Sequence, residues 1–561
     1  LHYDDSLGHL PNGSVPDSVA IALYNASDHL PVLAKFIFQG GTQPSAEPTL
    51  QASNVGFNTV MSGSMGVTWT NGNGAYRIVV ARAGGPVSFT PTDGQSYPAN
   101  SNFALATDLG SGNKAVFSGS GNSIAVTGLA SNTTYHFAVY EFNGSGGTEN
   151  YLTTFPATNS QATLSVTYYS QGNLPPDILS SWNSERGGSG SPPANFTSGV
   201  PFVVQGGDSM TTTSTWSISG SGSALQIESG GTLTANHAIT LASTAMFQIA
   251  NGGTYIHNNT GVPASTVFQG VESFAGSSNV EIRGWVGSST AIPIISGAWG
   301  NLKITYSPAT AWNNLGNITS IQGSFTIDNN STSGFRFVGN APLTLTVEGD
   351  VNIVSGLLQI SNAGSNPNTF TLNLGGSFNQ TGGTFEPNVN TSSTLTINFK
   401  GSGKSFTKSA GTLVDNQIDW VVDSAASLTL MNGLTIGSSR SLTINGTITC
   451  GANAISGAGA VTVSSGAILD IGSVDGINSG TTLGNIRVSG SRTFDAGANY
   501  TLHGTAAQVM GNGFPATVNA LSIINSNGVT LSGGVAVNGS LMLVDGALSI
   551  ASNTLTLNGD T

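Results

Sequence analysis

The chain has 561 residues, enough for several domains, and only 7% of them are charged, against roughly 25% in an ordinary globular protein. Gly occupies 76 positions, and the formal net charge is −13 with Lys and Arg totalling 14. The small and scattered positive charge excludes a basic protein that binds nucleic acid or anionic membranes. The apolar residues are periodic and numerous enough for a core, which excludes a disordered chain. This composition suits an extracellular β-rich protein whose surface is wetted by Ser, Thr, Asn and Gly.

The cysteine content, the lengths of the apolar runs and the two ends of the chain each add one expectation. The one cysteine, Cys450, is predicted to be a small apolar core residue rather than a reactive thiol. No apolar run of about 18 residues occurs, so no membrane span is predicted. The sequence begins without Met and ends on Leu557-Asn558-Gly559-Asp560-Thr561, which opens a repeat without completing it. We therefore expect both ends to be cut from a longer parent.

An Asp-His pair, Asp28 and His29, lies just before an alternating stretch at 33–38 that is predicted to be a strand. A carboxylate can orient an imidazole or hold a divalent cation, and an imidazole can move a proton near neutral pH. An ordinary Asp-His turn has the same spacing, so the spacing alone leaves both interpretations open.

The string Ser-Asp-His-Leu-Pro-Val at 27–32 resembles the closing motif of the endonuclease/exonuclease/phosphatase superfamily, which has the DNase I-like fold. The resemblance covers residues 1–39 and implies the C-terminal fragment of an α/β sandwich hydrolase, a metal-dependent phosphodiesterase or phosphatase. It implies that Asp28 orients the histidine or helps to bind Mg²⁺ or another divalent cation, and that His29 contacts the scissile phosphate. The family's metal-binding Glu, Asp-x-Asn and second His would lie upstream, so the site is incomplete in this chain.

A Gly/Pro/Ser linker at 40–48 leads to alternating runs at sandwich spacing over 49–165. Trp69 is placed like a core residue on an early strand. The segment 128–135, with Leu129 and Tyr135, resembles the fibronectin type III corner, in which a Leu caps the core and the Tyr hydroxyl bonds back to the backbone. The resemblance implies a seven-strand β-sandwich that acts as a spacer or binds partners through loops.

Polar residues and one loop of this segment are candidates for a site. His136 and Glu141 are predicted to have ordinary strand-face roles. The loop 91–97 is predicted to be a simple turn, although it could also hold a sugar against Tyr97.

Residues 166–201 form a junction that contains Tyr168, Tyr169 and Trp182. These aromatic side chains are predicted to cover the apolar face of the first coil of the element that follows. An aromatic platform for a sugar is the alternative.

The remaining residues, 202–561, repeat one phrase. Val347-Glu348-Gly349-Asp350-Val351-Asn352-Ile353 returns as Val537-Asn538-Gly539-Ser540-Leu541-Met542-Leu543, and related phrases begin at Ile321, 347 − 321 = 26 positions earlier, and at Leu374, 374 − 347 = 27 positions later. An earlier pair at Leu225 and Phe247 is spaced by 247 − 225 = 22. A period in the twenties with two-residue alternation and Gly/Asn turns predicts a long right-handed parallel β-helix, a rod of very roughly 70 Å.

Acidic residues on this rod are few. Glu348 and Asp350, two residues apart, are predicted to point the same way on one strand, and Asp470 and Asp475 flank a turn. Neither pair has a cationic partner nearby in sequence, so we expect no active site there. A Ca²⁺ site at Asp470 and Asp475 is the weaker alternative, because the regular Asp-bearing nonapeptide of calcium-binding rolls is missing.

A hydrolase remnant, a fibronectin type III-like sandwich and a Gly/Ser/Asn-rich solenoid in series resemble large secreted surface proteins of Bacteroidota, many of which use the type IX pathway. The resemblance implies an extracellular or outer-surface location and contact with secretion machinery. The leading hypothesis is the stalk and adhesion region of a larger parent that carries the hydrolase. The alternatives are a structural protein whose solenoids self-associate into filaments and a carbohydrate-binding or carbohydrate-active β-helix protein. Surface glycans are the expected partners of the solenoid, with no nucleic acid.

Overall fold

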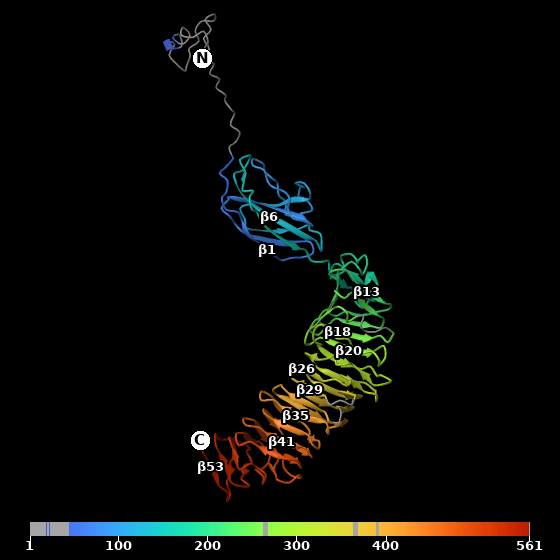
Figure 1. Ribbon diagram of the computed structural model, residues 1–561, viewed down its shortest axis with the longest axis vertical. Helices are drawn as coiled ribbons and strands as arrows, with labels where there is room; N and C mark the ends of the chain where they lie inside the picture. Colours follow the sequence, from blue (N-terminus) through green and yellow to red (C-terminus); the bar gives the residue numbers. More distant parts are fainter. Residues whose placement is uncertain are drawn as a thin grey trace. The chain divides into compact units, whose positions relative to one another are not determined.

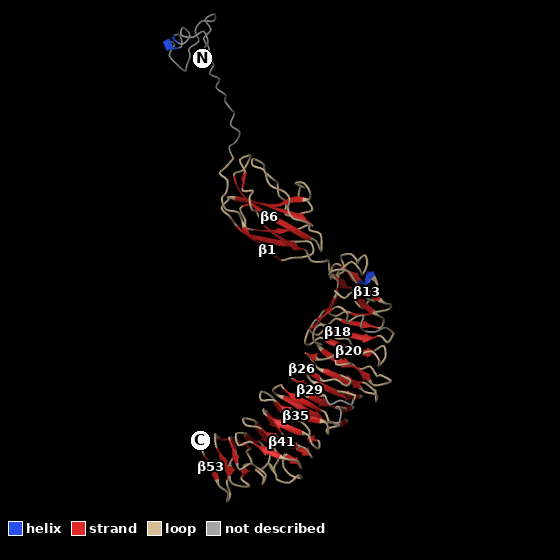
Figure 2. Ribbon diagram, viewed as in Figure 1, coloured by secondary structure: helices blue, strands red, loops and turns tan. Residues whose placement is uncertain are grey.

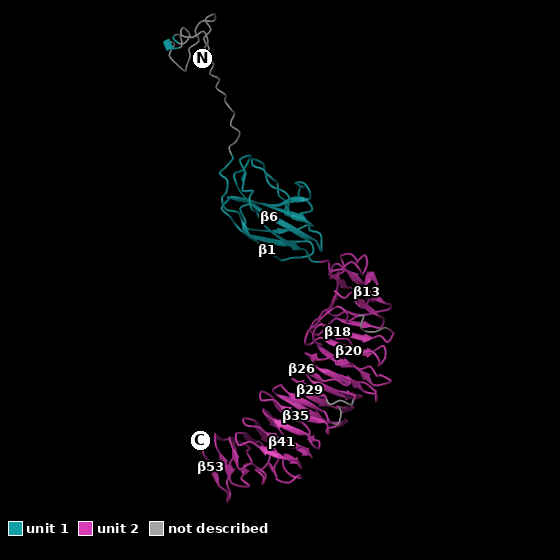
Figure 3. Ribbon diagram, in the orientation of Figure 1, with its two compact units in different colours: residues 1–164 teal, residues 165–561 magenta. Residues whose placement is uncertain are grey.

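The computed structural model describes residues 18, 19, 22, 44–261, 267–362, 368–388 and 392–559. The chain divides into two compact units, Leu1–Leu164 and Ser165–Thr561 (Figure 3). Strands make up nearly all the regular structure of both units (Figure 2). The prediction of an all-β fold is therefore confirmed.

The first unit contains an antiparallel β-sandwich of two sheets. The three-stranded sheet has the order β1 (Ser53–Asn58), β2 (Met65–Thr70), β5 (Ser123–Val126). The other sheet has the order β4 (Asn113–Gly119), β3 (Tyr76–Ala83), β6 (Thr134–Asn143), β7 (Asn150–Tyr151), with β8 (Ala157–Ala162) also paired to β6. Trp69, Val79 and Phe137 belong to the core between the sheets, as alternation predicts for Trp69.

Strands β3 and β6 are buried on both faces. Their second face packs under the long connection between β3 and β4, where Ile78, Tyr140 and Phe142 contact Phe89 and Tyr97. This connection gives the sandwich a third layer, which the candidate site uses.

The segment before β6 has the corner geometry that its sequence predicts. The Tyr135 hydroxyl accepts a hydrogen bond from the backbone N–H of Ala130 at 2.8 Å, and Leu129 is buried beside it. The bond satisfies a backbone donor at the point where the chain enters the sheet.

The second unit is a parallel β-solenoid, which confirms the predicted architecture (Figure 1). Most coils contribute one strand to each of three faces, whereas the coils that begin with β18 and β20 contribute fewer. One face is an unbroken sheet of fifteen strands, and the other two are divided into shorter sheets. The strands pair in parallel, except that β10 is antiparallel to β9.

The fifteen-stranded sheet consists of β12 (Ser209–Thr211), β15 (Thr232–Ala235), β18 (Thr254–Asn258), β20 (Asn279–Gly284), β21 (Asn301–Ile304), β24 (Phe325–Asp328), β27 (Val351–Ser355), β30 (Phe378–Gln380), β33 (Lys404–Lys408), β36 (Ser427–Leu430), β39 (Thr447–Thr449), β42 (Ile468–Ile471), β45 (Asn499–Leu502), β48 (Ala520–Ile524) and β51 (Leu541–Asp545). The second face consists of three sheets: β10 (Trp182–Asn183), β9 (Tyr168–Ser170), β11 (Pro201–Val204), β14 (Ala224–Ile227), β17 (Met246–Ile249) and β19 (Val271–Phe274); β23 (Ser320–Ile321), β26 (Leu343–Val347), β29 (Thr369–Leu374), β32 (Thr394–Phe399), β35 (Ile418–Val422), β38 (Ser441–Ile444), β41 (Ala460–Val463) and β44 (Arg492–Phe494); β47 (Thr517–Val518), β50 (Val535–Val537) and β53 (Leu555–Leu557). The third face consists of four sheets: β13 (Trp216–Ile218) and β16 (Ile239–Leu241); β22 (Trp312–Asn313), β25 (Phe335–Arg336), β28 (Leu357–Gln359), β31 (Thr384–Glu386) and β34 (Thr412–Leu413); β37 (Leu434–Ile436), β40 (Ile455–Gly457) and β43 (Ile486–Val488); β46 (Gln508–Val509), β49 (Val529–Thr530) and β52 (Leu548–Ser549). A short 3-10 helix, η1 (Leu179–Ser181), precedes β10.

The register places like residues above one another. Ile321 pairs with Val347, and Val347 pairs with Leu374, which are the spacings read from the repeated phrase. Leu225 likewise pairs with Phe247. The inward side chains of successive coils form one buried cluster from Trp182 to Val537, so each coil shields its apolar face with the coils on either side.

The glycine inside the repeated phrase marks a corner rather than a point within one strand. Strand β26 ends at Val347 and β27 begins at Val351. A β-carbon at Gly349 would lie 2.5 Å from the backbone carbonyl carbon of Gly323 on the preceding coil, closer than real side chains approach. The prediction that Glu348 and Asp350 lie on one strand is therefore wrong, because the chain turns between them.

Aromatic side chains cover the first coil. Trp182 is 1% exposed, with its ring centroid 5.2 Å from that of Phe202 and 5.5 Å from that of Trp216. Tyr168 stacks on Phe202 at 5.9 Å, and the Trp182 indole N–H donates to the Pro176 carbonyl at 2.8 Å. Trp182 and Tyr168 thus pack on the apolar side chains of the first coil, and the burial of Trp182 rules this ring out as a sugar platform.

Candidate functional site

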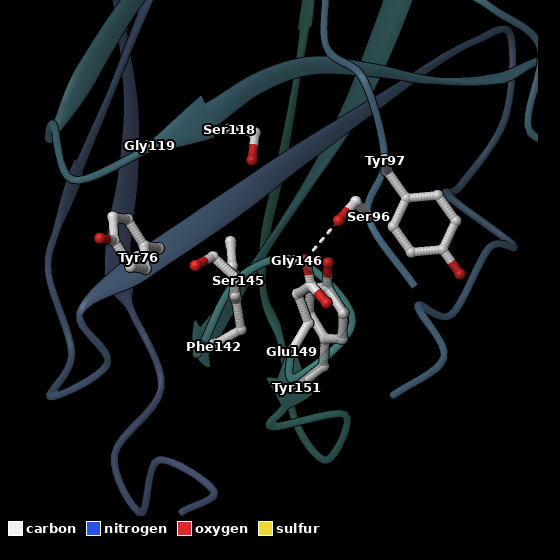
Figure 4. A pocket seen from close by; sticks show the side chains of 11 residues that line it. Tyr76, Ser96, Tyr97, Ser118, Gly119, Phe142, Ser145, Gly146, Glu149 and Tyr151 are labelled. Carbon is white, nitrogen blue, oxygen red and sulfur yellow. Dashed lines mark hydrogen bonds between the residues drawn. The ribbon is translucent and has the colours of Figure 1, made fainter. Parts of the chain in front are cut away.

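The candidate site is a hollow of about 320 Å³ on the sandwich (Figure 4). It lies between the start of β3, the β6–β7 hairpin and the loop from Thr92 to Tyr97, and its edge includes Ser118 and Gly119 of β4. Four aromatic side chains line it, namely those of Tyr76, Tyr97, Phe142 and Tyr151.

The four rings form a continuous row. The ring centroids of Tyr76 and Phe142 are 5.5 Å apart, those of Phe142 and Tyr151 are 4.7 Å apart, and those of Tyr151 and Tyr97 are 6.0 Å apart. Phe142 and Tyr151 are buried, whereas Tyr76 is 40% exposed and Tyr97 is half-buried. The buried rings thus support two partly exposed rings at the ends of the row.

The pairing of β6 with β7 explains why Phe142 and Tyr151 meet. These residues are cross-strand partners in the hairpin, whose turn contains Gly144 and Gly146 at positive φ. Side chains directly opposite each other on antiparallel strands lie within contact distance.

Hydrogen bonds fix the loop that carries Tyr97 against the hairpin. The Asp93 carboxylate accepts from the Tyr151 backbone N–H at 2.8 Å, and the Gly94 N–H donates to the Glu149 carbonyl at 2.7 Å. The Tyr151 hydroxyl donates to the Gln95 carbonyl at 2.9 Å. Gly94 has φ +74°, a conformation that favours glycine and allows this tight return.

Glu149 is the charged residue among those described that line the hollow. Its carboxylate accepts hydrogen bonds from the Ser96 hydroxyl and, at 2.8 Å, from the Gly147 backbone N–H (Figure 4). The bond from Ser96 lowers the pKa of the Glu149 carboxyl, so the group is ionised at neutral pH. Burial, followed by the charge of Glu149, raises the pKa of Tyr151 and keeps its phenol protonated as a donor.

The hollow also carries hydroxyl groups that have no hydrogen-bond partner within the described parts of the chain. They belong to Tyr76, Ser118 and Ser145. Hydroxyl groups both donate and accept, so the site can bind a ligand that has an apolar face and a polar rim.

Of the described site residues predicted from the sequence, only Tyr97 lies at the candidate site. Asp28 and His29 lie outside the described residues. Tyr97 does line the hollow, so the loop that could hold a sugar is part of the candidate site. The aromatic partners Tyr76 and Tyr151 and the acid Glu149 were missed, although the Gly-rich turn after Asn143 is a hairpin signal that places Tyr151 opposite Phe142.

Glu141 has a structural role on its strand, in a buried ion pair that was not predicted from the sequence. Its side chain is 0% exposed and forms a two-point ion pair with Arg77, at 3.2 Å from Nε to Oε1 and 3.0 Å from Nη2 to Oε2. Backbone N–H groups of Gly72 and Gly74 donate to the same carboxylate, each at 3.0 Å. The pair is structural, because its hydrogen bonds fix the turn between β2 and β3.

Two of the acids singled out on the solenoid, Asp350 and Asp470, have separate structural partners. Asp350 accepts from the Ser377 backbone N–H at 2.7 Å and so braces the corner of the next coil. Asp470 lies 3.5 Å from the His503 imidazole, a partner on the next coil that sequence distance concealed. Burial raises the pKa of the Asp470 carboxyl.

Cys450 is fully buried, as predicted, and burial raises the pKa of its thiol. A thiol in this setting stays protonated and packs as an apolar residue.

Comparison with models of known protein families gives no match to this sequence, and no curated protein matches it. Among the described residues, no helix has the length and apolar character needed to cross a membrane.

Proposed function

We propose that this chain is the stalk and adhesion region of a secreted or cell-surface modular protein. The observation that carries the proposal is the unbroken fifteen-stranded sheet above a single buried cluster that runs from Trp182 to Val537. Each coil contacts only its neighbours, so every added coil contributes a similar stability and the element can grow long, which suits a spacer. The low charge and the Ser-, Thr- and Asn-rich surface support an extracellular setting.

Within this proposal the sandwich is a fibronectin type III-like module that presents loops to partners. Support comes from the corner at Leu129 and Tyr135, with its bond to the Ala130 N–H. The series of modules resembles large secreted surface proteins of Bacteroidota, and export by the type IX pathway belongs to the same proposal.

The parent of this chain carries, in our proposal, a metal-dependent phosphodiesterase-like domain that ends near residue 39. Asp28 would help to bind Mg²⁺ or another divalent cation or orient His29, which would contact the phosphate. The motif at 27–32 supports this part of the proposal. Hydrolysis of bis(p-nitrophenyl) phosphate by the longest available parent, tested with and without Mg²⁺ and with His29→Ala, checks this part separately.

Immunolabelling tests the surface location. Antibodies raised against this chain are expected to label intact cells that produce the protein, and brief protease treatment of those cells should remove the signal. Labelling that requires permeabilised cells would overturn the proposal.

Sedimentation velocity separates the stalk from the filament alternative. A stalk is expected to remain monomeric as concentration rises, whereas solenoids that assemble end to end would sediment faster with concentration. Growth into large species would replace the stalk by the filament.

A further inference from the structure

We propose that the hollow lined by Tyr76, Tyr97 and Glu149 binds a neutral saccharide unit of a glycan. This inference deepens the adhesive role and rests on it for its biological setting. The saccharide site itself is argued from three features of the hollow: its aromatic surface, its hydrogen-bonding groups and its charge.

The aromatic surface matches the apolar face of a pyranose ring. Tyr76 is 40% exposed while its ring rests against buried Phe142, so the ring is held in place before any ligand arrives. Tyr97 is held in the same way by Phe89 at 5.1 Å and by its hydroxyl, which accepts from the Thr92 backbone N–H at 3.0 Å. Pre-organised rings lower the entropy cost of binding.

The hydrogen-bonding groups match the rim of a sugar. The Glu149 carboxylate accepts hydrogen bonds and donates none when ionised, and two of its acceptor positions are already used by Ser96 and Gly147. Its remaining lone pairs suit the donor hydroxyls of a sugar. The hydroxyls of Ser118 and Ser145 add groups that can both donate and accept.

The charge of the hollow selects against anionic glycans. Of the described residues that line it, Glu149 is the only charged one. A uronate or sulfate placed there would meet a carboxylate without a compensating cation, so neutral sugars are favoured.

A proline-rich peptide is the other kind of ligand that aromatic grooves bind. Such a peptide has no hydroxyl donors and would leave the Glu149 carboxylate without new partners, at a cost in desolvation. The observations therefore favour the saccharide, and the peptide becomes one outcome of the test.

The test is titration of the full chain, by calorimetry and saturation-transfer NMR, with neutral hexasaccharides of glucose, mannose, xylose and N-acetylglucosamine in α- and β-linked forms. At least one of them is expected to bind. Tyr76→Ala should weaken this binding by about tenfold, the equivalent of one lost aromatic contact, whereas Tyr76→Phe should keep it. Phe155→Ala is the matched control, since Phe155 is 93% exposed on the same unit but does not line the hollow.

The inference is overturned if no member of the panel binds, or if Tyr76→Ala binds as tightly as the parent chain. It is equally overturned if a hyaluronan hexasaccharide or decaproline binds more tightly than every neutral sugar and loses this binding in Tyr76→Ala. Because these titrations do not depend on where the protein resides, their failure is distinguishable from a failure of the surface-labelling experiment.

Discussion

The buried imidazole of His257 makes the solenoid sensitive to acid. Its side chain is 3% exposed, its Nδ1 lies 3.1 Å from the Tyr255 hydroxyl, and its ring centroid is 5.3 Å from that of Trp285. Burial lowers the pKa of His257 from 6.5 to about 4. The native coil therefore holds a neutral imidazole at pH values where the unfolded chain has already taken up a proton.

The direction and size of the effect follow from this pKa difference. A folded-state pKa below the unfolded value contributes stability that is complete above about pH 6.5 and is lost as the pH falls toward 4. With an unfolded pKa of about 6.5, the loss at about pH 5 is roughly 2 kcal/mol in the free energy of unfolding.

The assay is urea unfolding of the full chain at about pH 7.5 and about pH 5, followed by circular dichroism. His257→Gln keeps a side-chain acceptor for Tyr255 but cannot titrate, so its stability difference between the two pH values should be smaller than the parent's by roughly 2 kcal/mol. The carboxylates are the same in both chains, so their contributions to the pH dependence cancel in the comparison. An undiminished pH difference in His257→Gln would refute the reasoning.

Three further predictions concern packing. Gly349→Ala places a β-carbon against the backbone of the preceding coil and should lower the free energy of unfolding by about 1–3 kcal/mol, whereas Gly533→Ala, which meets nothing within 4 Å, should have little effect in the same urea titration. Arg77→Met leaves the buried Glu141 carboxylate unpaired and should cost the sandwich about 3–5 kcal/mol, measured as the shift of its calorimetric transition, and an unchanged transition would contradict a buried ion pair. Trp182→Ala removes the ring that covers the first coil and should cost about 3–5 kcal/mol, with faster hydrogen exchange in the first coils than in the later ones.

The stacking of the solenoid could be predicted from the sequence because residues that are one repeat apart pair with each other on neighbouring coils. The spacing between Ile321, Val347 and Leu374 is the length of one coil, and the structure pairs these residues directly. The corner at Gly349 could not be read from alternation, since Val347 and Val351 are both buried and keep an even spacing across the turn. Alternation reports which side chains face the core and not whether the backbone between them bends.

The candidate site was less predictable, for a different physical reason. Tyr97 could be singled out as an aromatic residue in a turn, but its neighbour Tyr151 reaches it only through the folding of the β3–β4 connection over the sheet. The Glu149 carboxylate and the Ser96 hydroxyl, 53 positions apart, meet by the same long-range closure. No local pattern encodes such a contact, whereas the hairpin that pairs Phe142 with Tyr151 has its signal in the intervening glycines.

The row of paired residues Ile321, Val347 and Leu374 also bears on how the length of the solenoid can change. Val347 meets Ile321 on one side and Leu374 on the other, and all three are aliphatic side chains in the same register. A deletion or duplication of the residues from Val347 up to Leu374 would therefore still place one aliphatic side chain beside another at this position. The solenoid can in this way lengthen or shorten by one coil without leaving the apolar face uncovered at this point.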